Sequence, residues 1–157
     1  MKLNMKQIQN IVSGMNMLSE DIKAGKLKLE YGTSLTIAVT KKKLAPVYEG
    51  YTELRDALLE EMCVKDEKGQ KVKIPAKTDA EGNIIVPEQW DLGGRDEEWK
   101  AEVKKLLLEE QEIERLEPFP LASFKIKKVK GADGKEEEGD INPEILFLLV
   151  PWLVLES

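Results

Sequence analysis

The spacing of apolar residues constrains the fold of this chain more than any other feature of its sequence. Between residues 4 and 23, apolar side chains recur at steps of three and four residues, which places them on one face of a helix. They are Ile8, Ile11, Val12, Met15, Leu18 and Ile22. Asn4 and Gln7 have the spacing of a capping box that begins this helix, and Gly25 is suited to end it. We therefore predict a first amphipathic helix over residues 4–23.

A second stretch with helical spacing runs from Thr33 or Ser34 to Met62. Its predicted apolar face carries Leu44, Val47, Tyr48, Tyr51, Leu54, Leu58 and Met62. Pro46 interrupts the pattern, because proline lacks the backbone N–H that a helix interior needs. We expect either one kinked helix or two helices that meet near residues 43–45.

A third helical stretch follows the glycine pair 93–94 and ends near residues 116–117, because Pro118 prevents its continuation. Residues 95–117 include nine acidic and five basic side chains, so four of the six net negative charges of the chain lie here. Three amphipathic helices predict a mainly α fold of the α+β type.

The regions between these helices have extended character. Residues 64–94 lack the helical period and contain glycine turns and prolines at strand ends, which predicts an inserted β-hairpin that projects from a single helical domain over residues 1–157. Short strands are expected near residues 26–31 and 121–130, and a mobile loop over residues 131–140.

Composition excludes several classes of function. The chain has no histidine, so it contains no imidazole for a catalytic triad, a zinc-bound water or a pH switch. A single cysteine, Cys63, forms no internal disulfide, and a reducing cytoplasm is expected. The net charge of −6 disfavours nucleic acid as a partner. We predict no catalytic residues, no metal site and no cofactor.

The last apolar stretch, residues 145–155, is the strongest local signal for a partner surface. It follows Asn142-Pro143-Glu144, which is a favourable start for a short helix, and it is too short to cross a membrane. Because it is apolar on every side, it packs either into its own core or against another chain, including a second copy. The candidate partner contacts are Phe147, Trp152 and Leu153 here and Ile84, Ile85 and Trp90 in the hairpin.

Scattered cationic residues suggest a second kind of site. Arg95 stands at the front of the third helix, and lysines cluster before Pro46 and along the strand near residue 126. The candidate anion-binding residues are Lys41, Lys42, Lys43, Arg95, Lys125 and Lys127. The alternative is a solvated face that acidic neighbours balance, as charge runs usually are.

The order of these segments resembles a family of small uncharacterised phage and prophage proteins. The segments that carry the resemblance are Met1–Leu3 with the following helix, the Leu27–Leu29 connector, the helix of Tyr48 and Tyr51 that runs into residues 65–70, the acidic third helix, and Asn142–Ile145. The chain departs from the family pattern in an enlarged hairpin at residues 76–91 and in Pro46. The resemblance implies a protein in the bacterial host cytoplasm or the virion, and it brings no catalytic residues.

Two functions agree with these observations. The first is a non-enzymatic interaction protein of phage origin that binds a virion component or a host factor such as a defence protein. The second is an oligomeric protein that sequesters a nucleotide signal or another small ligand in a lysine-lined cleft between subunits. An enzyme ranks third, because every candidate base is a carboxylate or a lysine without a recognisable partner.

Overall fold

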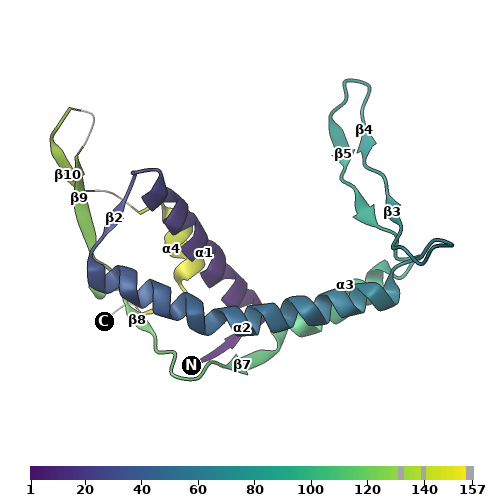
Figure 1. Ribbon diagram of the computed structural model, residues 1–157, viewed down its shortest axis with the longest axis horizontal. Helices are drawn as coiled ribbons and strands as arrows, with labels where there is room; N and C mark the ends of the chain where they lie inside the picture. The colour runs from purple at the N-terminus through teal and green to yellow at the C-terminus, as the bar shows by residue number, and fades with distance from the viewer. Residues whose placement is uncertain (131–132, 139–140, 155–157) are drawn as a thin grey trace. The chain divides into compact units, whose positions relative to one another are not determined.

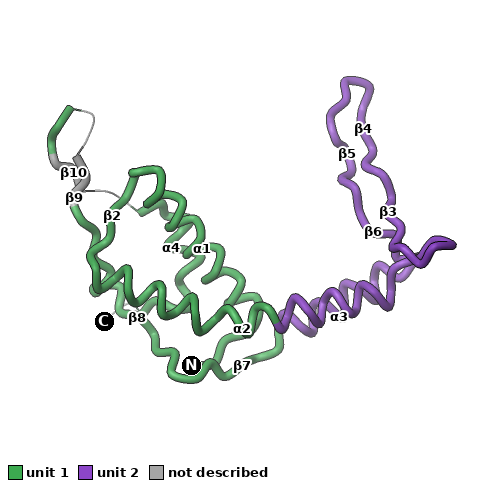
Figure 2. The backbone as a smooth tube through the Cα atoms, in the orientation of Figure 1, with its two compact units in different colours: residues 1–49, 108–157 green, residues 50–107 purple. Residues whose placement is uncertain are grey.

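The computed structural model describes residues 1–130, 133–138 and 141–154 of the chain. Four α-helices and several short paired strands make up these residues, so the fold is α+β (Figure 1). Contacts divide the chain into two compact units where the sequence predicts one domain (Figure 2). Unit 1 comprises residues 1–49 and 108–157, and unit 2 comprises residues 50–107.

Short strands precede, separate and follow the helices along the chain. The helices are α1 (Met5–Lys23), α2 (Tyr31–Met62), α3 (Asp96–Leu108) and α4 (Pro143–Leu149), with a single 3₁₀ turn, η1 (Leu121–Ser123). The strands are β1 (Lys2–Asn4), β2 (Lys28–Leu29), β3 (Lys73–Ile74), β4 (Lys77–Thr78), β5 (Ile84–Val86), β6 (Gln89–Trp90), β7 (Glu110–Glu112), β8 (Phe119–Pro120), β9 (Ile126–Lys130), β10 (Glu136–Glu138) and β11 (Leu153–Val154). None of the described helices combines the length and the apolar character that a membrane span requires.

Helix α1 forms as its sequence predicts. The Asn4 side chain accepts a hydrogen bond from the Gln7 backbone N–H at 2.9 Å, and the Gln7 side chain accepts one from the Asn4 N–H at 2.9 Å. These two bonds satisfy donors that the first turn leaves free. After the helix, Gly25 has a φ of +74°, a left-handed conformation that glycine adopts without strain. The predicted capping box and helix end are confirmed.

Helix α2 continues without a break through Pro46, so the two-helix alternative is wrong. The proline ring leaves the carbonyl of Lys42 without its usual helical donor, and both residues are exposed, so water can satisfy that carbonyl. On the predicted apolar face, Leu44, Tyr51 and Met62 are buried, whereas Leu54 is exposed.

Unit 1 is built around the contact of α1 with α4, which lie side by side in Figure 1. Three small sheets surround this pair: β1 with β7, β2 with β9 and β10, and β8 with β11. The last pair is parallel, and the others are antiparallel. Within the predicted mobile loop, residues 136–138 form β10 against β9. Residues 131–132 and 139–140 of that loop lie outside the described residues.

The third helix is shorter than its sequence period predicts. It ends at Leu108, and residues 110–112 form β7, in which Gln111 pairs with Leu3. The sequence predicts that the excess negative charge lies on this helix, and that prediction is wrong. Helix α3 itself carries four acidic and three basic residues, and the acidic excess lies in residues 109–117. Pairing with β1 overrides the local helical preference there.

Unit 2 contains the rest of α2, the hairpin and α3. Strand β3 pairs with β6 and β4 with β5, which makes one hairpin in two tiers within the predicted segment (Figure 1). Its turn is held by the Asp79 carboxylate, which accepts hydrogen bonds from the backbone N–H groups of Glu81 and Asn83. The Asn83 side chain also donates to this carboxylate, at 2.9 Å. That bond is the largest cause of the lowered pKa of Asp79, and the backbone hydrogen bonds lower the pKa further.

Candidate functional site

The short helix α4 is fixed by its first residues. Asn142 caps it, because its side-chain oxygen accepts a hydrogen bond from the Glu144 backbone N–H at 2.9 Å, and Pro143 occupies the first turn. The chain then turns back, with the Trp152 N–H bonded to the Leu149 carbonyl at 2.9 Å. The predicted cap and helix start are confirmed, and the turn gives α4 an inner and an outer face.

The inner face of the C-terminal stretch belongs to the core of unit 1. Ile145, Leu149 and Trp152 are completely buried. Close approach of α1 is possible because Gly14 has no side chain: a Cβ atom there would lie 3.0 Å from the Leu148 Cβ atom. On this face, the apolar stretch packs into the core of its own chain, which is one of the two predicted alternatives.

Trp152 belongs to this buried face, although the sequence offers it as a candidate partner contact. Its ring stacks on Phe119 with centroids 5.1 Å apart, and Phe119 meets Phe124 edge-on at 6.2 Å. The large indole fills the space beside the β8–β11 pair, and for that reason it lies inside rather than on the surface. Among the described residues, its Nε1 atom has no hydrogen-bond partner.

The outer face of α4 is exposed and apolar. Phe147 is 74% exposed and Val150 is 60% exposed. These two residues border a pocket of about 440 Å³ in unit 1. All of its lining residues are apolar, namely Leu121, Leu146, Phe147, Val150, Leu153 and Val154. Two of the predicted partner residues, Phe147 and Leu153, thus share one site.

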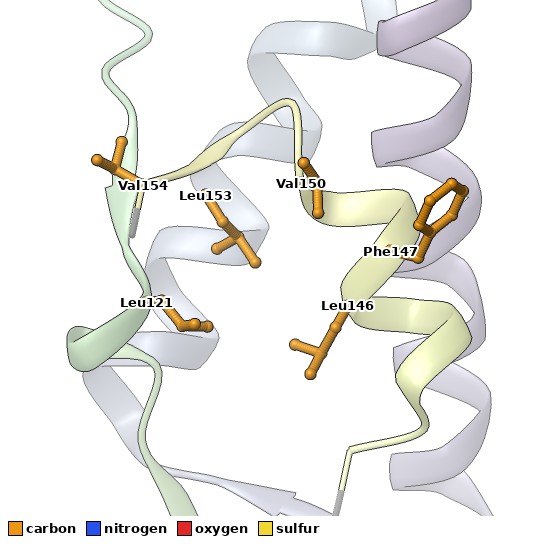
Figure 3. Close-up of a pocket in the computed structure, with 6 residues that line it drawn as sticks. All are labelled: Leu121, Leu146, Phe147, Val150, Leu153 and Val154. Carbon is orange, nitrogen blue, oxygen red and sulfur yellow. The ribbon is translucent and has the colours of Figure 1, made fainter. Parts of the chain in front are cut away.

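Figure 3 shows how three elements assemble this pocket. Leu146 projects from α4 toward Leu121 of η1 and Leu153 of β11, so the hollow lies between the helix and the β8–η1 segment. The parallel pairing of β11 with β8 places Leu153 opposite Phe119, directly before η1. The pocket therefore forms only where β11 pairs with β8, which lies far from it in the sequence.

The apolar surface extends beyond this pocket. A second hollow of about 480 Å³ shares Leu121 and Leu146 with the first. Its remaining lining residues are Phe124, Ile126, Ile141 and Pro143. Sequence reasoning missed Leu121 and Leu146. The available signal for Leu146 was its four-residue step to Val150, which places both residues on one side of the helical path, next to the buried face.

The hairpin candidates lie in unit 2, and none of them lines the apolar pocket. Ile84 and Ile85 are 67% and 65% exposed on β5. Trp90 is half-buried on β6, and the ammonium groups of Lys73 and Lys71 lie 4.7 Å and 5.5 Å from the centre of its ring. Trp90 therefore contacts two cationic side chains of its own unit.

The cationic candidates are held separately rather than in one cluster. Lys41 donates to the Asn16 side chain at 3.0 Å, and Lys43 donates to the Arg115 carbonyl. Together with Lys42, they occupy successive helix positions, which point about 100° apart. Lys125 and Lys127 are exposed in a different element, at the start of β9.

Arg95 belongs to unit 2, where its Nε and Nη2 atoms each donate a hydrogen bond of 2.8 Å to one oxygen of the Glu98 carboxylate. This ion pair raises the pKa of Arg95 and lowers the pKa of Glu98. The predicted anion site is thus not assembled within one unit. A lysine-lined cleft between subunits stays a prediction.

Cys63 and the acidic residues form no recognisable reactive centre in the described part of the chain. Cys63 is buried, and its Sγ atom contacts the Val72 carbonyl at 3.6 Å, as expected for a packing thiol. Among the described residues, no group of three or more cysteine, aspartate or glutamate side chains is placed to hold a metal ion. The apolar pocket brings together two of the residues that the sequence offers as partner contacts, Phe147 and Leu153, and it is the candidate functional site.

Comparisons with known proteins identify no relative: no family model, no curated protein and no solved structure matches this chain. The pocket geometry and the residues that line it are consequently the basis for any functional assignment.

Proposed function

We propose that this chain is a non-enzymatic protein of phage or prophage origin that binds a protein partner through the apolar pocket of unit 1. The partner is a virion component or a host factor such as a defence protein. The observation that carries the proposal is the exposure of Phe147 beside a hollow lined only by apolar side chains. A contiguous apolar surface of this kind on a folded protein usually marks an interaction site.

The arrangement of the pocket supports a protein rather than a polar small ligand. The side chains that line it offer no hydrogen-bond donor and no charge to orient such a ligand. An aromatic side chain at the rim of an apolar hollow is a typical anchor of protein interfaces, where a few large residues supply most of the binding energy. Phe147 is expected to be that anchor.

Affinity capture from infected or host cells tests the proposal with two matched variants. Phe147→Ser removes the anchor, whereas Tyr31→Ser removes another exposed aromatic residue of unit 1 that does not line the pocket. We expect the wild-type protein and Tyr31→Ser to retain the same stoichiometric partner and Phe147→Ser to lose most of it. Capture of background proteins alone, or equal retention by Phe147→Ser, would contradict the proposal.

Light scattering on the same proteins determines whether a second copy covers the pocket. A wild-type oligomer that becomes a monomer in Phe147→Ser, but not in Tyr31→Ser, would identify the homo-oligomer that the apolar stretch also predicts. A wild-type monomer would leave the pocket to another protein.

A further inference from the structure

Unit 2 contains a second hollow of different chemistry, with a volume of about 340 Å³. Two half-buried indoles contribute to its wall, Trp90 from β6 and Trp99 from α3. The remaining lining residues are Leu59, Gln89, Leu92, Asp96 and Lys100. This hollow therefore combines aromatic rings with a carboxylate and an amide, which the apolar pocket of unit 1 lacks.

The Trp90 ring already attracts cations within its own unit. The ammonium group of Lys73 lies 4.7 Å from the ring centre, and that of Lys71 lies 5.5 Å from it. Both distances lie within the range in which the negative face of an indole stabilises a positive charge. Glu88 pairs with Lys73 at 2.9 Å, and Glu60 pairs with Lys71 at 3.0 Å and also with Lys65. These carboxylates offset part of the positive charge that an added cation would meet beside the ring.

The charge balance also favours a cationic ligand. Unit 2 has fourteen acidic and ten basic residues and a net charge of −4, whereas unit 1 has a net charge of −2. Lys100, which also lines the hollow, donates to Glu97 at 2.9 Å and interacts more weakly with the charge of Asp96. In the part of the chain that the structure describes, no hydrogen bond or ion pair engages the Asp96 carboxylate, which leaves it available to a ligand.

We propose that this hollow binds an arginine side chain from a basic segment of a partner protein. A guanidinium group is planar and stacks on indole faces, while its N–H groups donate to a carboxylate. Trp90 and Trp99 supply the aromatic faces, and Asp96 supplies the acceptor. The site lies in unit 2 and is independent of the apolar pocket, so it holds or fails separately from the proposed function.

Titration of the ¹⁵N-labelled full chain with an acetylated Gly-Arg-Gly amide tests the proposal. The indole N–H resonances of the three tryptophans are assigned with Trp→Phe variants. We expect saturable shifts for Trp90 and Trp99 and none for Trp152, which is buried in unit 1. The same peptide with citrulline, a neutral residue of nearly the same shape, should cause no shift. Unchanged resonances at millimolar arginine peptide, or an equal response to citrulline, would overturn the proposal.

Two charge variants separate a local contact from the general field of the unit. Asp96→Asn should weaken the binding of the arginine peptide roughly threefold, the size expected for one exposed ion pair. Glu102→Gln removes the same charge from the same helix, but Glu102 does not line the hollow and instead bonds Lys105 at 2.6 Å. Its binding should equal that of the wild type. Equal weakening in both variants would overturn the role of Asp96, and the backbone amide resonances of residues 50–107 report that unit 2 of each variant is folded.

Discussion

The two units of this protein are stabilised in different ways. The ten largest fully buried side chains of the described residues all lie in unit 1. They come from α1, α2, α4 and the short segments around them, and they are Leu3, Ile8, Ile11, Met15, Leu18, Leu27, Leu44, Ile145, Leu149 and Trp152. In unit 2, by contrast, α3 has no buried residue. Apolar packing therefore dominates unit 1, and unit 2 depends more on contacts at its surface.

Surface contacts in unit 2 are mainly ionic. Glu60 bonds both Lys65 and Lys71 at the end of α2, at 2.7 Å and 3.0 Å. Along α3, three ion pairs link residues three positions apart. Each exposed pair contributes at most about 1 kcal/mol, so unit 2 should open more readily than unit 1. A protein with this division can keep one rigid unit while the other presents charged and aromatic side chains.

The largest expected effect comes from cutting the core of unit 1. Leu149→Ala should lower the free energy of unfolding by about 2–5 kcal/mol, because it leaves a cavity between α4 and α1. The matched variant Leu107→Ala, at a half-buried position of α3, should cost only about 1 kcal/mol. Urea unfolding together with amide hydrogen exchange measures both losses and assigns them to a unit. Equal losses would contradict the contrast between the units.

Replacing two helical glycines by alanine should change the free energy of unfolding by smaller amounts, in opposite directions at the two positions. In Gly14→Ala the new methyl group would lie 3.0 Å from the Leu148 Cβ atom and 3.1 Å from the Leu149 Cδ2 atom, so we expect a loss of about 1–2 kcal/mol. In the described part of the chain, a Cβ atom at Gly50 meets nothing within 4 Å apart from its own helix backbone and chain neighbours, so Gly50→Ala should stabilise α2 by about 0.5–1 kcal/mol. Thermal unfolding of the two variants checks the signs. Stabilisation by Gly14→Ala would show that α1 and α4 are not in close contact.

The smallest expected effect is a dependence of the stability of unit 2 on pH. Hydrogen bonds from Lys65 first, and then from Lys71, lower the pKa of Glu60 from 4.5 to about 2. A carboxyl whose pKa falls on folding stabilises the folded state above its unfolded value, so this contribution is complete above pH 4.5 and is lost as the pH falls toward 2. A ¹³C titration of the carboxyl groups should place the Glu60 midpoint near 2. Replacement of both lysines by methionine should return it to its ordinary range, and an unchanged midpoint would refute the ion pairs.

Local signals made part of this fold predictable. The cap of α1 lies within residues 4–7 and the cap of α4 within residues 142–144, so four and three consecutive residues contain these signals. The hairpin was also predictable, because its turn is formed by Asp79 with its near neighbours. Interactions of this kind depend little on the rest of the chain.

Pairing between residues that are distant in the sequence explains where the sequence-based predictions were wrong. Residues 110–112 continue the helical period, yet they form β7 because Gln111 pairs with Leu3, more than one hundred positions away. The candidate site has the same character. The apolar stretch alone gives no reason to place Trp152 inside and Phe147 outside, since both are large and apolar. Only the packing against α1 and the pairing of β11 with β8 separate them.

The base of the hairpin has a practical consequence for protein engineering. The Val64 N–H donates to the Asp91 carbonyl at 2.8 Å, and the Asp91 N–H donates to the Val72 carbonyl at 2.9 Å, so the two ends of the hairpin are fastened together. The entropic cost of a longer loop grows only slowly with its length. An epitope or a fluorophore-accepting sequence inserted at the Gly82 turn should therefore leave α2 and α3 intact. The turn offers an internal labelling position that leaves both chain ends free.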